Sequence, residues 1–326
     1  MERKTLLEIL DSAGGEFISG EELAAWLGVT RSAIWKGIRQ LRAEGYDIRS
    51  KTNNGYALLG NPDLLTPKKI SDCTSMAYPA ERISVFPSVK STNSLLRQQA
   101  MEGAPEGTVV VAEEQTGGRG RMGRSFLSPQ GGLYMSILVR PQMEAGRILF
   151  LTMIAALSVI DAVQRLYGVT LSIKWVNDIL FHGRKLSGIL TEASMDGESG
   201  GLEFAAVGIG INFRGRDQFP TEIASKAAVL EEITNLPLSR SKLCGAILDE
   251  FWGRYHAFSA TGDTAELLSR YRSHLCMLGQ RIRVLSPQGE YYAVAMDIAD
   301  NGALLVQRED GSITSVQSGE ISIRPD

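Results

Sequence analysis

The spacing of apolar residues changes twice along this 326-residue chain, which excludes a single uniform architecture. In residues 2–43 the apolar residues are spaced as in amphipathic helices, whereas residues 83–258 combine apolar strand-like runs with long helical stretches. From residue 277 the pattern becomes short alternating segments broken by Gly, Pro and Asn-Gly. The sequence therefore predicts an α+β protein of several domains, with bounds at 1–60, 61–82 (a linker), 83–276 and 277–326.

The first domain has the pattern of a winged helix-turn-helix. Residues 2–12 carry a helical apolar stripe, and Ser19 with Glu22 has capping-box spacing for a second helix. Gly28 ends that helix and Thr30 can cap a third. The following segment, YDIRSKTNNGYALLG, predicts a hairpin with an Asn-Gly turn. Three helices and a hairpin together predict the winged fold.

The third helix and the hairpin are rich in cations, which suits DNA. A recognition helix presents its first residues to base edges in the major groove and its cations to phosphates. The predicted DNA-binding residues are Arg31, Ser32, Trp35, Lys36 and Arg39 on the helix, and Arg49 and Lys51 on the wing. The alternative is a winged domain that makes protein contacts only and whose basic face is simply solvated.

Composition limits the environment of the chain. The formal net charge of −3 argues against a protein that coats nucleic acid, so any such binding is local. No apolar run approaches the roughly 20 residues that span a bilayer, and the N-terminus does not read as a signal peptide. Three widely separated cysteines favour a reducing cytoplasm without a disulfide framework. We expect a cytoplasmic protein with no membrane partner.

The run QTGGRGRMGR at residues 115–124 is too rich in glycine for a regular helix or strand. It lacks the Lys-Ser/Thr ending of a nucleotide P-loop. Backbone N–H groups and guanidinium groups are nevertheless well suited to a phosphate or a carboxylate. The run predicts an anion site, with a mobile surface loop as the alternative.

Two further stretches place polar residues beside apolar strands. Ser91-Thr92-Asn93 follows one strand and opens a helix, so hydroxyl and N–H groups converge there. Residues 171–181, LSIKWVNDILF, are predicted as one strand that carries polar residues. Lys174 in such a strand is costly unless it meets an anion.

Together these motifs resemble the biotin–protein ligases. Residues 115–124 are similar to the family's GRGRxGR, 174–178 to KWPND, 183–190 to GRKLxGIL and 208–212 to GIGIN, in the same order. With the winged helix, the resemblance covers nearly the whole chain and is strongest to the bifunctional class, which is both ligase and biotin-operon repressor. It implies a mixed α/β ligase domain of the biotin/lipoate ligase type, followed by an SH3-like small β-barrel.

The resemblance implies an activity and its residues. The family activates biotin with ATP to biotinyl-5′-adenylate, then transfers biotin to a lysine of a biotin carboxyl carrier protein. Lys185, Arg119 and Arg121 carry over as catalytic cations, and Phe126, Asn177, Asn212 and Arg121 as nucleotide contacts. Biotin contacts carry over to Ser91, Thr92, Asn93, Gln115, Gly118, Arg119, Gly120, Arg121, Lys185 and Gly188. Asp178 carries over as a ligand for Mg²⁺.

The chain departs from the family at three positions. Val176 replaces a proline, Phe126 stands where tryptophan is frequent, and Met122 replaces a frequent arginine. Glu320 and Arg324 match a C-terminal ending that contacts nucleotide or carrier protein. None of the three departures removes a group that the reaction requires.

The resemblance also implies partners. Biotinyl-adenylate is expected to promote a homodimer that binds operator DNA, and the same surface is expected to dock the carrier protein. Three alternatives remain: a lipoate–protein ligase, a biotin-sensing transcription factor with feeble ligase activity, and a ligase whose winged helix no longer binds DNA.

Overall fold

The computed structural model describes residues 3–43, 46–51, 54–59, 63–195, 197, 201–286, 289–317 and 319–323. The chain divides into two compact units. The first is Met1–Thr66 with Pro237–Ser239, and the second is Pro67–Leu236 with Arg240–Asp326. The second unit therefore includes the C-terminal strands as well as the central sheet.

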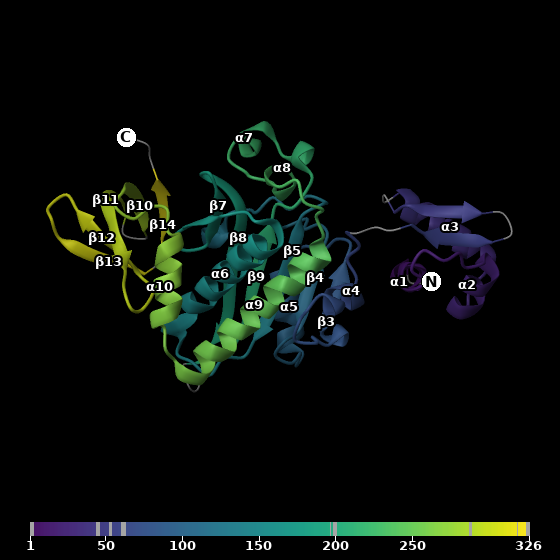
Figure 1. Ribbon diagram of the computed structural model, residues 1–326. Helices are drawn as coiled ribbons and strands as arrows, with labels where there is room; N and C mark the ends of the chain where they lie inside the picture. The colour runs from purple at the N-terminus through teal and green to yellow at the C-terminus, as the bar shows by residue number, and fades with distance from the viewer. Residues whose placement is uncertain are drawn as a thin grey trace. The chain divides into compact units, whose positions relative to one another are not determined.

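The first unit is the predicted winged helix-turn-helix (Figure 1). Ser19 Oγ accepts from the Glu22 N–H at 3.1 Å, and the Ser19 N–H donates to the Glu22 carboxylate at 3.0 Å, so the capping box is confirmed. Gly28 ends the second helix with a φ of 62°. The elements are α1 (Arg3–Ser12), α2 (Gly20–Leu27), α3 (Arg31–Ala43), β1 (Ile48–Lys51) and β2 (Gly55–Leu58). Residues 52 and 53 of the hairpin lie outside the described residues.

A seven-stranded sheet forms the centre of the second unit, in the order β3-β4-β5-β9-β8-β7-β6. β3 and β4 are parallel, and the other neighbours are antiparallel. The strands are β3 (Ile83–Phe86), β4 (Val109–Ala112), β5 (Leu133–Val139), β6 (Ser172–Lys174), β7 (Asp178–Phe181), β8 (Arg184–Met195) and β9 (Leu202–Ile211). This is the mixed α/β domain that the sequence predicts.

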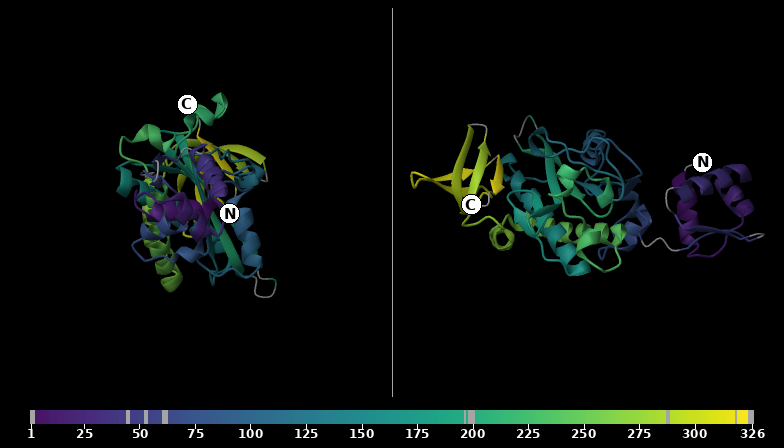
Figure 2. Two further views of the ribbon diagram at one scale, coloured as in Figure 1. Left: turned by 90° about the vertical axis from the view of Figure 1, so that its right-hand side faces the viewer. Right: turned by 90° about the horizontal axis from the view of Figure 1, so that it is seen from above.

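Helices cover both faces of this sheet (Figures 1 and 2). α5 (Thr92–Met101) packs on one face through Leu96, which shares a buried cluster with Leu138. α6 (Ile148–Tyr167) and α9 (Arg240–Thr261) lie on the other face, where Cys244 of α9 contacts Met135. Because successive strand residues point to opposite faces, every residue of β5 is buried.

The segment Ala145–Tyr167 is long and apolar enough to cross a membrane by length and composition, and 72% of its apolar window is buried inside the protein. Core helices pass the same test, so this is weak evidence for a membrane span. Its burial between the sheet and α9 is that of a core helix.

Five antiparallel strands form the C-terminal part of the second unit, in the order β13-β12-β11-β10-β14. They are β10 (Arg281–Ser286), β11 (Gly289–Ile298), β12 (Leu304–Arg308), β13 (Ile313–Val316) and β14 (Glu320–Ile323). The inward positions of these strands are apolar and buried, for example Ile282, Val284 and Ala295. A small β-rich domain is therefore present, as predicted.

Several local predictions differ from the structure. Residues 171–181 form a hairpin of β6 and β7 rather than one strand, because the chain turns at Trp175-Val176-Asn177, where the peptide Trp175–Val176 is cis. By contrast, a short helix within the predicted linker 61–82, which the sequence allows at 67–73, is present as α4 (Pro67–Asp72) and packs on α9 and β3. Three helices were not predicted: α7 (Thr221–Ala224), α8 (Leu230–Ile233) and α10 (Ala265–His274). Short 3₁₀ turns occupy Ala80–Arg82, Arg121–Gly123, Ala145–Arg147 and Arg216–Gln218.

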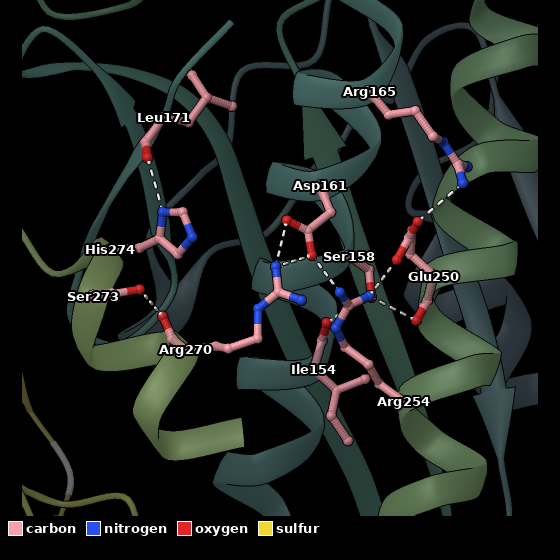
Figure 3. A network of polar contacts seen from close by, with 10 residues as sticks. All are labelled: Ile154, Ser158, Asp161, Arg165, Leu171, Glu250, Arg254, Arg270, Ser273 and His274. Carbon is pink, nitrogen blue, oxygen red and sulfur yellow. Dashed lines mark hydrogen bonds and ion pairs between the residues drawn. The ribbon is translucent and has the colours of Figure 1, made fainter. Parts of the chain in front are cut away.

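A network of ion pairs joins α6, α9 and α10 (Figure 3). Asp161 of α6 accepts from Arg254 of α9 and from Arg270 of α10, the latter at 2.8 and 2.9 Å. Glu250 also accepts from Arg254, at 2.7 Å, and pairs with Arg165 at 3.0 Å. Asp161 thus holds α10 against the core helices.

We expect Asp161→Ala to lower the free energy of unfolding by about 2 kcal/mol, because Arg254 and Arg270 lose their shared acceptor and the Arg254 side chain is only 17% exposed. Urea denaturation would measure this. The matched control is Glu309→Ala, which removes an exposed ion pair with Arg281 and is expected to cost less than about 1 kcal/mol. Equal losses in the two variants would contradict a structural role for the network.

Candidate functional site

A cavity of about 270 Å³ lies in the second unit. Its walls come from the start of α5, the glycine–arginine run, the β6–β7 turn, β8 and β9. The predicted site residues that line it are Ser91, Thr92, Asn93, Gln115, Arg119, Gly120, Arg121, Phe126, Asn177, Asp178, Lys185 and Gly188. Gly118 and Asn212 are not among the lining residues. The motifs therefore meet at one place, although they are spread over more than 100 positions of the sequence.

The start of α5 forms the polar end of the cavity. Ser91 caps the helix by accepting from the Ser94 N–H at 3.4 Å. The Thr92 N–H donates to Gln115 Oε1 at 2.9 Å, and Gln115 Nε2 donates to Ser128 Oγ at 2.9 Å. These bonds tie α5 to the start of the glycine–arginine run and to Ser128 beyond its end, and they fix the Gln115 amide.

Gly118 supports this end from behind the wall. A Cβ at this position would overlap with the Phe126 carbonyl oxygen and would stand 3.2 Å from Gln115 Nε2. Only glycine leaves room for this close packing. Gly118 therefore shapes the polar end of the cavity without lining it.

The glycine–arginine run folds back on itself rather than lying open. The Gly120 N–H donates to the Arg124 carbonyl at 2.7 Å, and Arg119 and Ser125 form an isolated antiparallel β-bridge. Met122, at the tip, has a φ of 54° and is exposed. Arg121 reaches across the cavity to Asn177 Oδ1 at 3.5 Å. The turn thus brings Arg119, Arg121 and Arg124 to the cavity wall.

One carboxylate and two ammonium groups meet opposite this run. Asp178 pairs with Lys174 at 2.9 Å through one oxygen and with Lys185 through the other. Burial alone would raise the pKa of Asp178, but the charges of Lys185 and Lys174 lower it below its ordinary value. Asp178 is therefore ionised and holds both lysines at the cavity.

The charge of the cavity favours an anion. Five cations line it, Arg119, Arg121, Arg124, Lys174 and Lys185, while Asp178 is the one carboxylate among the described lining residues. Fixed guanidinium and ammonium groups in a partly dry site bind phosphate and carboxylate strongly.

Phe126 forms an apolar wall beside these charges. Its ring lies on the glycine positions of β8 and β9: a Cβ at Gly210 would stand 2.6 Å from the ring, and one at Gly188 would stand 3.2 Å from it. Lys185 Nζ is 5.5 Å from the ring centroid, in cation–π range. The two glycines therefore make the space that the aromatic ring occupies.

Comparison with known proteins agrees with this geometry. Residues 85–212 match the biotin/lipoate A/B protein ligase family, residues 2–57 match an HTH domain, and residues 277–324 match the biotin protein ligase C terminal domain. The chain is 35% identical to the bifunctional ligase/repressor BirA of Bacillus spizizenii, over 98% of each protein. The chain belongs to the BirA family. The resemblance drawn from the motifs is thereby confirmed.

Other BirA relatives extend the comparison. The bifunctional ligase/repressor BirA of Escherichia coli is 30% identical, over 96% of this chain and 94% of that protein. The solved structure of the Aquifex aeolicus biotin protein ligase in complex with biotin and ATP matches with a TM-score of 0.65 and 31% identity. That match covers 75% of this chain and 99% of the Aquifex chain.

In this BirA family member Asn212 lies behind Lys185. Its Nδ2 donates to the Lys185 carbonyl at 3.0 Å and to the Ala228 carbonyl at 3.1 Å, and its side chain is buried. Both amide protons are used inside the protein. Asn212 thus fixes the backbone of Lys185, and its contact with the nucleotide stays a prediction.

Asp178 does not form a magnesium site with its neighbours. Both of its oxygens face lysines, and no group of three or more His, Cys, Asp or Glu side chains within the described ranges could hold a metal. The single negative charge of this carboxylate is already neutralised by two ammonium groups, so a divalent cation would be repelled there. The protein's own residues therefore do not fit Mg²⁺ at Asp178.

The β6–β7 turn is anchored from outside the ligase motifs. Tyr271 of α10 donates to the Val176 carbonyl at 2.7 Å, and Trp175 Nε1 donates to the Gly302 carbonyl at 3.2 Å. Gly319, which precedes β14, lines the cavity. The C-terminal part of this BirA family member thus helps to build the site, which the sequence did not reveal.

Of the C-terminal pair predicted to contact ligands, Arg324 lies outside the described residues, and Glu320 begins β14.

The predicted DNA-binding residues share one property in the first unit: their side chains are exposed. They are Arg31, Ser32, Trp35, Lys36 and Arg39 on α3, and Arg49 and Lys51 on β1. Trp35 is 52% exposed, with the Arg39 guanidinium 5.6 Å from its ring. Arg42 instead donates to the Ile48 carbonyl at 2.7 Å and to Ser50 Oγ at 2.6 Å, which holds the wing to α3. An exposed large aromatic amid cations fits a nucleic-acid surface.

Proposed function

We propose that this protein is an ATP-dependent biotin–protein ligase and a biotinyl-adenylate-dependent repressor. The observation that carries the proposal is the cavity itself, where a cluster of neutral polar groups at α5 adjoins five cations. A neutral cyclic urea suits the first part, and a carboxylate facing a triphosphate needs the second.

The cavity residues divide the work of adenylation. Ser91, Thr92 and Gln115 orient the ureido ring, and Phe126 covers the adenine. Lys185, Arg119 and Arg121 draw the biotin carboxylate and the α-phosphate together against their repulsion. A carboxylate oxygen then attacks the α-phosphorus, pyrophosphate leaves, and the cations stabilise the charge that develops on the phosphoryl oxygens. Asn177 holds Arg121, and Asn212 holds the backbone of Lys185.

The second half-reaction uses no nucleophile of the enzyme. The ε-amine of a lysine in a biotin carboxyl carrier protein attacks the acyl carbon of the adenylate, and AMP leaves. Magnesium is assigned to the triphosphate of ATP, because Asp178 is neutralised by its two lysines. We place the reaction in the cytoplasm, in keeping with three free cysteines.

The regulatory half belongs to the winged unit. Biotinyl-adenylate is expected to promote a homodimer, and two winged helices then meet a two-fold operator. Arg31, Ser32, Trp35 and Lys36 are assigned to base edges, and Arg39, Arg49 and Lys51 to phosphates. Docking of the carrier protein and dimerisation are proposed to compete for one surface of the ligase unit.

The ligase proposal is tested by pyrophosphate release with biotin or lipoate as the acid. We expect release to depend on biotin and ATP, with lipoate at least about a hundredfold poorer, since a pocket built to hydrogen-bond one ligand rejects another that lacks those groups. Substantial pyrophosphate release with lipoate alone would show that lipoate, and not biotin, is the substrate.

The repressor proposal is tested by gel shifts on DNA upstream of biotin genes. We expect retention to strengthen when biotin and ATP are both added, and also when preformed adenylate is added alone. Retention that responds to neither addition would overturn the repressor assignment while leaving the ligase assignment intact.

A further inference from the structure

A row of buried hydrogen bonds runs behind the biotin end of the cavity. Ser136, in the middle of β5, is fully buried, with its Oγ 2.8 Å from Thr92 Oγ1 and 2.7 Å from Asn93 Oδ1. Ser136 is not among the residues that line the cavity, whereas Thr92 and Asn93 are. Ser136 can therefore act on a ligand only through these neighbours.

The Asn93 amide has one possible orientation. Its Nδ2 donates to the Leu190 carbonyl and to the Glu192 carboxylate, each at 2.9 Å. Neither partner can donate, so the amide cannot be reversed and its oxygen faces Ser136. Arg97 pairs with Glu192 at 3.2 Å and holds that carboxylate in place. Gly208 leaves the space for the amide, because a Cβ there would overlap with Asn93 Oδ1.

The Gln115 amide is fixed in the same way. Ser128 Oγ donates its one proton to the Phe126 carbonyl at 2.9 Å, so it must accept from Gln115 Nε2. Gln115 Oε1 therefore faces Thr92, where it accepts from the Thr92 N–H at 2.9 Å and lies 3.2 Å from Thr92 Oγ1.

These fixed amides determine where the hydroxyl protons go. The Ser136 hydroxyl has one proton, and Asn93 Oδ1 can only accept a hydrogen bond. Ser136 therefore donates this proton to Asn93 Oδ1. The Thr92 hydroxyl then has two acceptors, Ser136 Oγ and Gln115 Oε1, and both belong to the protein. Toward a ligand that reaches Thr92 Oγ1, this hydroxyl can therefore only accept a hydrogen bond, because its one proton is used inside the protein.

We infer that Ser136 is a positioning residue that holds the Thr92 hydroxyl as a hydrogen-bond acceptor, so that the cavity selects a ligand with an N–H group at this point. A cyclic urea presents such an N–H, whereas a ligand with a carbonyl or ether oxygen there meets a lone pair. This inference rests on the proposed function for the identity of the ligand. The row runs from the partly exposed Glu192 through the buried Asn93, Ser136 and Thr92, and it transmits the orientation from the Arg97–Glu192 ion pair to the ligand.

The experiment is a double-mutant cycle on the full chain, read by the equilibrium Kd for biotin and by the KM for ATP. We expect Ser136→Ala to raise the Kd for biotin about tenfold and to leave the KM for ATP within about twofold, because one oriented hydrogen bond is weakened. In a Thr92→Val background, Ser136→Ala is expected to change the Kd for biotin less than twofold, because the hydroxyl that it positions is gone. Ser136→Cys, which keeps a weak donor and acceptor, is expected to lie between wild type and Ser136→Ala.

The matched control is Ser158→Ala. Ser158 is also fully buried, but its hydroxyl only donates to the Ile154 carbonyl within α6, at 2.7 Å (Figure 3). We expect Ser158→Ala to leave the Kd for biotin and the KM for ATP unchanged. Thermal unfolding of Ser136→Ala and Ser158→Ala then separates a loss of stability from a loss of binding.

Two results would overturn the inference. The first is that Ser136→Ala leaves the Kd for biotin unchanged while Thr92→Val binds biotin weakly. The second is that Ser136→Ala raises the Kd for biotin by the same factor in the wild-type and in the Thr92→Val background. In both cases the wild-type protein still binds biotin, so the proposed function stands. A wild-type protein that does not bind biotin overturns the proposed function, and with it the inference. If Ser136→Ala does not fold, the Ser136→Cys cycle gives the same decision.

Discussion

Lys185→Ala is expected to lower biotin-dependent pyrophosphate release by about a thousandfold, the largest effect of any single substitution in the cavity. The ammonium group of Lys185 sits between the only lining carboxylate described and the ring of Phe126, on a backbone fixed by Asn212. A steady-state assay of pyrophosphate release with saturating biotin and ATP measures the loss.

Lys174→Ala is the matched control for this prediction. Lys174 pairs with the same carboxylate of Asp178 and lines the same cavity, so both variants leave Asp178 with one ammonium partner. We expect Lys174→Ala to cost less than about tenfold. If the two variants lose the same activity, the charge balance at Asp178 matters rather than the position of Lys185.

The winged unit could be predicted from the sequence because its signals are local. The capping box at Ser19 and the left-handed Gly28 each depend on residues within a few positions, and both are present in the structure. The ligase site was predictable for a different reason. Its four motifs carry backbone requirements, such as Gly208 and Gly210, whose missing side chains make room for Asn93 and Phe126.

What the sequence missed depends on contacts between distant residues. The β6–β7 turn contains neither glycine nor proline, and alternation alone could not separate two strands from one. Its anchors, Tyr271 and Gly302, lie about a hundred residues further along the chain or more. The prediction of Asp178 as a magnesium ligand could not take its ion pair with Lys185 into account, because the distance between the two side chains cannot be read from spacing.

One missed residue did leave a signal. Ser136 interrupts the otherwise apolar strand LYMSILV, and a polar side chain in a fully buried strand needs a hydrogen-bond partner. The partners, Thr92 and Asn93, belong to a motif that was identified. A search for buried polar residues in apolar strands would therefore have found it, although not its role.

Gly55→Ala is expected to abolish operator binding while it leaves ligase activity within about twofold. Gly55 begins β2 with a φ of 97°, and a Cβ there would overlap with the Ile18 carbonyl oxygen. That carbonyl accepts from the Tyr56 N–H at 2.8 Å, so the overlap breaks the contact that joins the wing to the start of α2. Left-handed strain and a backbone clash together should cost the winged unit more than about 3 kcal/mol.

The control is Gly14→Ala in the same unit. Gly14 has a φ of 60°, but a Cβ there meets nothing within 4 Å, so only the backbone strain of about 1–2 kcal/mol remains. Gel shifts with preformed adenylate and pyrophosphate release are measured on the same preparations. Because every lining residue of the cavity belongs to the second unit, loss of the winged fold should not reach the chemistry. A Gly55→Ala protein that lost both activities would show that the ligase site depends on the winged unit. One that kept both would show that the wing tolerates the clash and that backbone overlap at Ile18 is relieved elsewhere.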